Sequence, residues 1–268
     1  MNILDKIVER KKQEVAAARE RIPEADLRRD AALPRERRSF FGSLENPGPY
    51  GINIIAEIKR ASPSKGVIRS NLDPLAYAEA YEAGGASAIS VLTDRSFFQG
   101  SLQDLETVRK AVRLPVLRKD FIISSYQIFE SAVRGADAVL LIVSILSDNQ
   151  LKDYLALSLE VGLDALVEVH TEADLERASR AGAKLIGINN RNLKSFETDI
   201  QRAAQMVKKL EIDQIAVAES GIRTREDIEE LKKTGIFNFL IGESIVRSAD
   251  PRAFITELRG SSKFKAES

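Results

Sequence analysis

Apolar and polar positions follow a repeating pattern from Ile54 onward, in units of roughly two dozen residues. Each unit has an amphipathic helical segment and then a short apolar stretch typical of a buried strand. A glycine stands near the end of most helical segments, where it tolerates the left-handed conformation that ends a helix. Two joints lack this glycine, at Leu114-Pro115 and at Ile212-Asp213.

The pattern predicts eight strands, at about residues 53–59, 86–92, 115–120, 137–143, 164–169, 184–189, 214–219 and 237–242. Helices are expected between and after them, at about residues 77–83, 101–112, 124–134, 148–161, 171–181, 199–210, 224–234 and 250–258. Several strands are almost continuously apolar, as in parallel sheets covered on both faces. The alternation therefore favours an α/β fold, a (β/α)8 TIM barrel. An open doubly wound sheet would more often carry a glycine fingerprint after its first strand, where this chain has Ser62-Pro63-Ser64.

The first 50 or so residues precede this repeat, and we interpret them as an N-terminal helical extension packed on the barrel. Residues 3 to about 21 carry an apolar stripe at helical spacing, and Pro23 ends or restarts the helix. The basic residues that follow, from Arg28 to Arg38, indicate a solvated face, with a dedicated anion or nucleic-acid patch as the alternative. Residues 1–268 are expected to form a single barrel domain.

Composition excludes several classes of function. The 40 basic residues balance the 40 acidic ones, so no overall charge favours nucleic acid or a membrane surface. The chain has no cysteine and one histidine, His170, which leaves no thiolate chemistry and no imidazole cluster for a metal. The N-terminus does not resemble a secretory signal, and the longest apolar run, Val139 to Val143, is too short to span a bilayer. We expect a cytoplasmic protein.

Charged or amide side chains end five of the predicted strands. In a TIM barrel these ends gather at one rim, where active sites lie. Glu57 and Lys59 are two positions apart on a strand and therefore share a face; an internal salt bridge is the alternative interpretation of this pair. The set predicts a cluster of general acids and bases. It consists of Glu57, Lys59, Lys119, Glu168, Asn189 and Glu219.

No metal site is predicted at this rim. Glutamate oxygens could hold Mg²⁺, but Lys59 and Lys119 already neutralise the neighbouring carboxylates. The chain also lacks a nucleophile elbow, a Walker loop and a dinucleotide fingerprint.

Glycine and serine follow the last two predicted strands, as Ser220-Gly221 and as Gly242-Glu243-Ser244. Exposed backbone N–H groups at the start of a helix bind phosphate well, and barrels use this position for that purpose. Ordinary glycine turns with a serine cap are the alternative. We predict a phosphate site formed by Gly221, Gly242 and Ser244, with Ser220 beside it.

These segments resemble the indole-3-glycerol phosphate synthase family. The similarity runs from the N-terminal helix to about residue 247. It rests on residues 57–64, Leu92-Thr93-Asp94, 97–101, 117–121, 166–170, 187–193, 218–222 and 241–244. The chain departs from the family pattern at Ser124, where an acidic residue is expected before the tyrosine.

The resemblance implies ring closure of 1-(2-carboxyphenylamino)-1-deoxyribulose 5-phosphate to indole-3-glycerol phosphate, a step of tryptophan biosynthesis that uses no cofactor. It implies that Lys119 is the general acid and that Glu168 acts as the base-side partner in dehydration. The resemblance also implies that Lys59 either pairs with the substrate carboxylate or acts as a second general acid. The expected orienting and binding residues are Glu57, Asn189, Arg191, Glu219, Ser62, Ser220, Phe98 and Phe121. Arg60, Asp120 and His170, one position out of register, are expected to be structural.

Two rival functions stay open from the sequence. The first is a Schiff-base aldolase that uses Lys119 or Lys59 as its nucleophile. The second is a non-catalytic barrel that binds a phosphorylated ligand, although such a protein would not need both Glu168 and Lys119. The expected partner is thus a phosphorylated small molecule, with no nucleic acid and no membrane. Association with other tryptophan-pathway enzymes, and the oligomeric state, are also left open.

Overall fold

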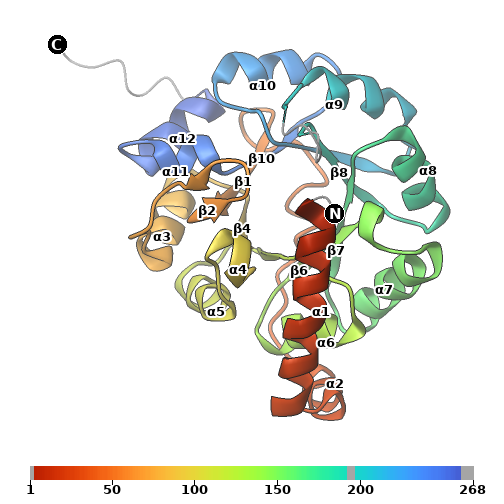
Figure 1. The fold of residues 1–268 in the computed structure, drawn as a ribbon. Coiled ribbons are helices and arrows are strands. Elements are labelled where there is room, and N and C mark those ends of the chain that lie inside the picture. Colours follow the sequence, from red (N-terminus) through yellow and green to blue (C-terminus); the bar gives the residue numbers. More distant parts are fainter. Residues whose placement is uncertain (1–2, 192–196, 261–268) are drawn as a thin grey trace.

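Eight parallel strands close into a barrel around which helices form an outer ring (Figure 1). The structure is a computed structural model that describes residues 3–191 and 197–260. The barrel strands are β1 (Asn53–Ile58), β4 (Ala88–Leu92), β5 (Val116–Lys119), β6 (Ala138–Ile142), β7 (Asp164–Val169), β8 (Leu185–Asn189), β9 (Ile215–Glu219) and β10 (Asn238–Ile241). Strand β1 pairs with β4 on one side and with β10 on the other, where Asn53 lies opposite Asn238. The predicted TIM barrel is confirmed.

The outer helices follow the strands in the expected alternation. They are α3 (Pro74–Gly84), α5 (Leu102–Ala111), α6 (Ser125–Val133), α7 (Asp148–Glu160), α8 (Glu172–Arg180), α9 (Gln201–Met206), α10 (Arg225–Lys232) and α12 (Pro251–Arg259), with 3-10 turns η1 (Val143–Ile145) and η2 (Val207–Lys209). Helix α3 begins earlier than predicted because Asp73 caps it, accepting a hydrogen bond from the Leu75 N–H, and Pro74 occupies its first turn. It ends at Gly85, whose φ of 86° requires a glycine.

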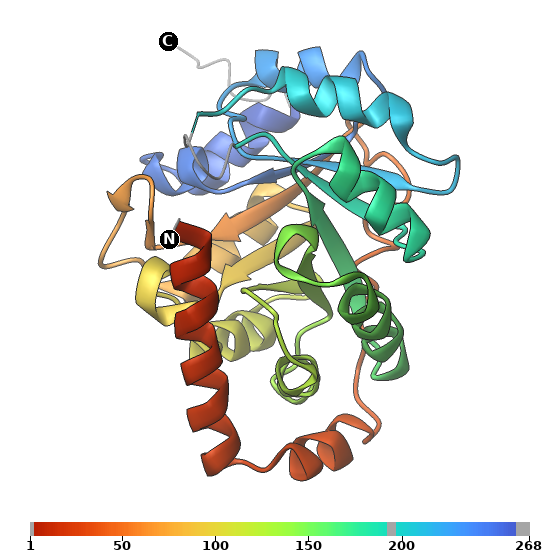
Figure 2. The same cartoon turned by 45° about the vertical axis from the view of Figure 1, so that its right-hand side comes forward.

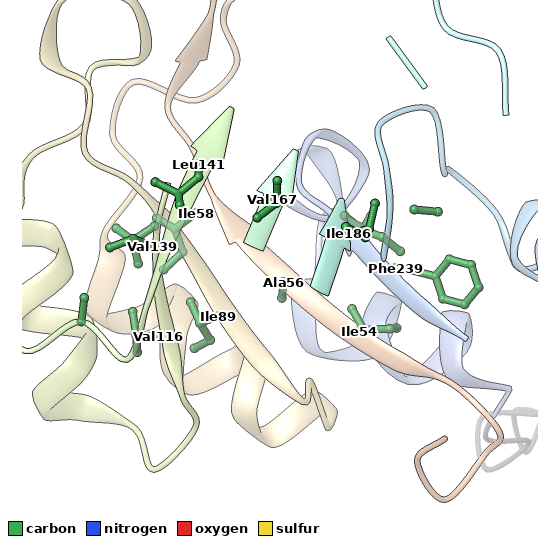
Figure 3. Packing of buried hydrophobic residues seen from close by; sticks show 14 of the residues in the cluster. Ile54, Ala56, Ile58, Ile89, Val116, Val139, Leu141, Val167, Ile186 and Phe239 are labelled. Atoms are coloured by element: carbon green, nitrogen blue, oxygen red, sulfur yellow. The ribbon is translucent and has the colours of Figure 1, made fainter. Parts of the chain in front are cut away.

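Two hydrophobic layers hold the barrel together, one on each face of the sheet. Alternate strand residues such as Ile54, Ala56 and Ile58 point outward and pack under the helices (Figure 3). Ile55, Leu117 and their counterparts point inward and fill the barrel axis. The near-continuous apolar strands of the sequence are therefore explained by burial on both faces.

The N-terminal extension begins with two helices, α1 (Ile3–Arg21) and α2 (Glu24–Ala31), which Pro23 separates. Helix α1 crosses the side of the barrel toward which the strand arrows point (Figure 2). After α2 the chain reaches the opposite end, where Phe40 and Leu44 are fully buried and join the inward-facing cluster. The extension thus touches both ends of the barrel.

The basic segment of the extension is not simply a solvated face, and our interpretation is wrong for two of its arginines. Arg35 donates hydrogen bonds to the carbonyl oxygens of Ala136 and Gly162, at 2.7 and 2.9 Å. Arg38 donates to those of Val112 and Leu114. These guanidinium groups satisfy carbonyls that follow α5, α6 and α7, and so attach the extension to the barrel.

Candidate active site

One pocket of about 660 Å³ opens at the C-terminal ends of the strands, and every site residue predicted from the sequence lines it. The strands bring Glu57, Lys119, Glu168, Asn189 and Glu219 together from β1, β5, β7, β8 and β9. The following loops supply the remaining residues, namely Lys59, Ser62, Phe98, Phe121, Arg191, Ser220, Gly221, Gly242 and Ser244. This convergence is a fact of geometry, and the role of each residue stays a prediction.

Lys119 is held between two buried carboxylates. Its Nζ lies 3.0 Å from Glu168 Oε2 and 2.7 Å from Glu219 Oε2. Burial alone would lower the pKa of Lys119, but Glu219, Glu168 and Glu57 together raise it above its ordinary value. Lys119 therefore carries a proton throughout the neutral pH range.

The two carboxylates differ in their surroundings. Glu168 is buried, but Lys119, His170 and a hydrogen bond from Asn189 Nδ2 at 3.2 Å lower its pKa. For Glu219, burial and the negative charge of Glu168 prevail over the pull of Lys119 and raise the pKa. Its Oε1 has no hydrogen-bond partner among the described residues. Within this pair, Glu219 is the carboxylate that more readily holds a proton.

Two glycines make room for the buried carboxylates of Glu219 and Glu57. A Cβ at Gly187 would collide with Glu219 Oε1, and a Cβ at Gly242 would collide with Glu57 Oε1. Glu57 in turn accepts a hydrogen bond from Lys59. Gly242 has a φ of −125°, so packing against Glu57 rather than backbone strain requires glycine there. The salt bridge considered for Glu57 and Lys59 does form, but it lies within the pocket.

The Gly-Ser loops after β9 and β10 meet at one side of the pocket. Ser220 and Gly221 have φ angles of 67° and 84°, and the Ser244 hydroxyl donates to the Ile222 carbonyl at 3.1 Å. Short helix α11 (Glu243–Arg247) starts from the second loop. The Glu243 carboxylate lies 3.1 Å from Arg247 Nε, which offsets its charge near the expected phosphate.

The opposite side of the pocket is apolar. The rings of Phe98 and Phe121 are tilted against each other with their centroids 6.0 Å apart. Ile3, Leu4 and Ile7 of α1 also line the pocket, which the sequence analysis did not foresee. The sequence showed that these residues form an apolar stripe, but the pattern did not predict which surface of the barrel the stripe covers.

Arg191 reaches the loops that follow β1 and β10. Its guanidinium donates to Ser64 Oγ and lies 3.9 Å from Glu243. Ser64 belongs to a small hairpin of strands β2 (Ala61–Ser62) and β3 (Gly66–Val67), which the sequence analysis did not predict. Asn192 and Leu193, which complete the similar motif after Arg191, lie outside the described residues.

Our placement of His170 one position out of register is wrong. His170 follows Glu168 by two residues, directly after the end of β7, and its Nε2 lies 3.3 Å from Glu168 Oε1, so the two side chains point the same way. Counting by two from Glu168 would have found it. Arg60 and Asp120 do form ion pairs, Arg60 with Asp104 at 2.5 Å and Asp120 with Lys11 at 2.9 Å.

Ser124, the departure from the family pattern, has local partners. It caps α6 by accepting a hydrogen bond from the Tyr126 N–H, and it accepts another from Arg19 Nη2 at 3.0 Å. Glu24 lies 2.8 Å from the same Arg19 nitrogen and supplies the negative charge that serine lacks. The loop is therefore anchored without an acid at position 124.

Within residues 3–191 and 197–260, no group of three acidic or histidine side chains is placed to hold a metal ion. In the same part of the chain, no helix is both long and apolar enough to cross a membrane.

Comparisons with known proteins agree with one another. A profile of the family described as indole-3-glycerol phosphate synthase matches residues 4–258. The enzyme of that name from Desulfosudis oleivorans is 56% identical over 96% of this chain and 98% of its own. That from Syntrophobacter fumaroxidans is 53% identical over 97% and 98%. Among solved structures, the N-acetylmannosamine-6-phosphate 2-epimerase from Clostridium perfringens superposes with a TM-score of 0.62, at 14% identity over 81% of this chain and 94% of that one, and so shares the fold alone. The chain belongs to the indole-3-glycerol phosphate synthase family.

Proposed function

We propose that this protein converts 1-(2-carboxyphenylamino)-1-deoxyribulose 5-phosphate to indole-3-glycerol phosphate, with release of CO₂ and water. One observation carries the assignment: a single pocket is lined by Lys119, by the paired rings of Phe98 and Phe121, and by the Gly-Ser loops after β9 and β10. The substrate has the matching layout, with an aromatic acid at one end, a ketone in the middle and a phosphate at the other. The ketone would then lie beside the charged ammonium group.

In the first step the ring carbon that bears the carboxylate attacks the ketone carbon. Lys119 donates its proton to the ketone oxygen as the new carbon–carbon bond forms, so no bare oxyanion accumulates. The carbon–carboxylate bond then breaks, CO₂ leaves, and the electron pair restores the aromatic ring. We place the substrate carboxylate near Lys59, whose positive charge favours its binding.

In the second step the new hydroxyl takes up a proton and leaves as water, and the adjacent methylene carbon of the new ring gives up a proton, while the ring nitrogen keeps its hydrogen. Glu168 is the proposed base, since its depressed pKa keeps it ionised and ready to accept the methylene proton. Glu219, whose raised pKa favours the protonated form, lies 2.7 Å from Lys119 and can return a proton to it. One proton is taken up overall, which balances the negative charge lost with the carboxylate.

The environment of Lys119 argues against the aldolase alternative. A Schiff base requires a neutral amine as nucleophile. Two carboxylates within 3.0 Å stabilise the ammonium form instead. Lys59 is likewise bound to a carboxylate, that of Glu57.

The purified protein should therefore form the fluorescent indole product from this substrate without added cofactor. Borohydride added during turnover should leave no substrate attached to a lysine. Substrate bound without product formation would favour the non-catalytic barrel, and a borohydride-stable lysine adduct would favour the aldolase.

A further inference from the structure

Helix α1 carries a lysine in the middle of its buried stripe. Ile7, Lys11 and Val15 follow one another at intervals of four residues and are the buried residues of this helix. Lys11 is only 4% exposed. A charged side chain is almost never this deeply buried unless it is paired, so its partners define what it does.

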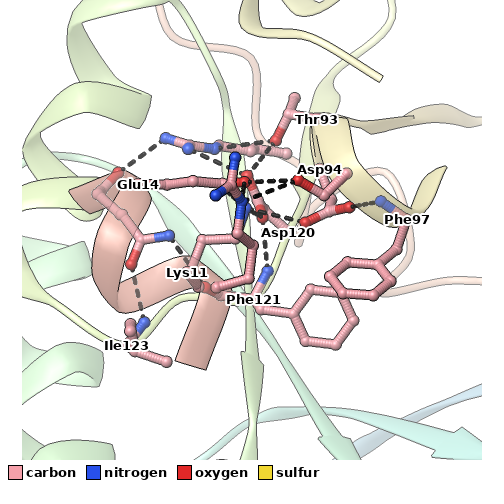
Figure 4. A network of polar contacts seen from close by, with 12 residues as sticks. Lys11, Glu14, Thr93, Asp94, Phe97, Asp120, Phe121 and Ile123 are labelled. Atoms are coloured by element: carbon pink, nitrogen blue, oxygen red, sulfur yellow. Dashed lines mark hydrogen bonds and ion pairs between the residues drawn. The ribbon is translucent and has the colours of Figure 1, made fainter. Parts of the chain in front are cut away.

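Three carboxylates surround the Lys11 ammonium (Figure 4). Its Nζ lies 2.7 Å from Glu14 Oε2, 3.0 Å from Asp94 Oδ2 and 2.9 Å from Asp120 Oδ1. Glu14 belongs to α1 itself, whereas Asp94 follows β4 and Asp120 follows β5. One side chain therefore ties α1 to two loops of the barrel mouth.

Both aspartates also shape the apolar wall of the pocket. Asp94 accepts a hydrogen bond from the Phe97 N–H at 2.7 Å and so caps α4 (Arg95–Phe98), the short helix that presents Phe98. Asp120 accepts one from the Phe121 N–H at 2.8 Å. The two backbone contacts place the paired rings of Phe98 and Phe121. Asp120 is also the neighbour of Lys119 in the chain.

Little else offsets the charge of these aspartates. Arg118 Nη2 lies 3.2 Å from Asp120, but the same guanidinium also lies 2.9 Å from Glu130 of α6. From α1, Arg10 pairs with Glu14 at 3.4 Å. Without Lys11, two buried carboxylates would face each other with Arg118 as the nearby cation, which is costly in a dry environment.

We infer that Lys11 is a positioning residue for the substrate-binding wall: by bridging Asp94 and Asp120 it clamps α1 over the mouth and fixes Phe98 and Phe121. This role deepens the proposed function, because the clamped wall would hold the aromatic end of the substrate. It predicts that loss of Lys11 weakens substrate binding more than it slows the chemical steps.

The first test is Lys11→Met, which keeps the length of the side chain and removes its charge. The KM should rise about tenfold or more, equivalent to losing one well-placed binding contact, while kcat changes less than threefold. Lys12→Met is the matched control, since Lys12 is 61% exposed and pairs only with Glu9 among the described residues. An unchanged KM for Lys11→Met, or an equal rise for Lys12→Met, overturns the inference.

The pH dependence separates positioning from simple loss of packing. In Lys11→Met the pKa of Asp120 should rise, because burial disfavours its charged form and the Lys11 ammonium no longer lowers the pKa. Lowering the pH from about 8 to about 6 should then favour its neutral form and bring the KM back toward that of the wild type. The double variant Lys11→Met/Asp94→Asn should show a low KM at both pH values, since asparagine still caps a helix. A pH-independent defect that the second change does not rescue contradicts the clamp.

Hydrogen exchange tests the clamp without turnover. Amides of residues 3–21, 94–98 and 120–124 should exchange faster in Lys11→Met than in Lys12→Met. If the wild-type protein did not convert the substrate, the proposed function would be wrong. The comparison of amide exchange between Lys11→Met and Lys12→Met would still test the clamp. Equal exchange in the two variants would overturn it.

Discussion

Lys119 and its two carboxylates form a unit whose three charges depend on one another. Either carboxylate alone would neutralise the ammonium, so ionising the second one leaves an excess negative charge in a buried place, which raises the pKa of Glu219. Gly187 admits this arrangement, because any side chain there would displace Glu219. The protein thus accommodates an electrostatic cost in the same place where the proposed chemistry needs a proton donor.

Lys119→Met should abolish most turnover and leave the barrel folded. Loss of a general acid lowers kcat by roughly 10²–10⁴-fold, whereas contacts to the two ends of the substrate are unaffected. Steady-state kinetics and circular dichroism measure both effects. A kcat within a few-fold of the wild type would remove Lys119 from the acid role.

Glu219 should reduce stability at neutral and alkaline pH. Its pKa is raised in the folded protein, above the ordinary value of about 4.3 that applies when the chain is unfolded. Between these two values the folded state holds a proton that the unfolded state has lost. The contribution of Glu219 therefore becomes more unfavourable as the pH rises through this interval.

The substitution Glu219→Gln removes this ionisation while keeping the size of the side chain. We expect the melting temperature of the variant to exceed that of the wild type near pH 8, with the difference shrinking toward pH 5, and activity to be lost. Thermal unfolding followed at several pH values measures this. A variant that is less stable than the wild type at every pH would show that Glu219 is ionised and well paired.

At the scale of elements, the length of a helix or strand determined whether the sequence predicted it. Strands of four to six mostly apolar residues and the outer helices of six or more residues were predicted within a few residues. Strands β2 and β3 have two residues each and helices α4 and α11 have four and five, too few to repeat a hydrophobic pattern. These short elements depend on tertiary partners, such as the Asp94 cap of α4.

The site residues illustrate the same limit. Glu57, Lys119, Glu168 and Glu219 could be found because each interrupts or ends an apolar strand. Lys11 also interrupts an apolar stripe, between Ile7 and Val15, but the two aspartates with which it pairs, Asp94 and Asp120, lie over eighty residues further along the chain. Periodicity identifies the face of α1 that is buried and contains no information on which loops it meets.

The loop after β9 offers a direct test of the phosphate prediction. Ser220 has a φ of 67°, a conformation that asparagine and aspartate tolerate better than most residues. Ser220→Asp should raise KM steeply through charge repulsion and weaken inhibition by inorganic phosphate. Ser220→Asn has the same size without the charge and should affect both quantities far less. Equal effects of the two variants would place the phosphate elsewhere.

At the scale of the whole molecule, the two ends of the barrel have different tasks. The strand C-termini hold the pocket, and the N-terminal ends are closed by Phe40 and Leu44 from the extension. The separation follows the general rule for this fold that function lies at one end and stability at the other. The extension contributes to both, through α1 at the mouth and through Phe40 at the base.

Phe40→Ala should therefore lower stability without altering catalysis. Phe40 is fully buried, and truncation of such a ring typically costs about 3–5 kcal/mol in the free energy of unfolding. Leu33→Ala, at a residue that is 61% exposed in the same extension, should cost little. Chemical denaturation gives the stability, and kinetics well below the melting temperature should give wild-type kcat and KM. A raised KM would indicate that the two ends are coupled.

The pairing of β1 with β10 also constrains the order in which the chain can fold during synthesis. The Asn53 side chain donates a hydrogen bond to the Asn238 side-chain oxygen at 2.9 Å. This bond cannot form until residue 238 has left the ribosome, long after β1 has been synthesised. Until then β1 has one free edge, and an unpaired edge is a place where chains associate wrongly. The barrel therefore closes late, and a nascent chain that stalls before residue 238 exposes both edges of an open sheet.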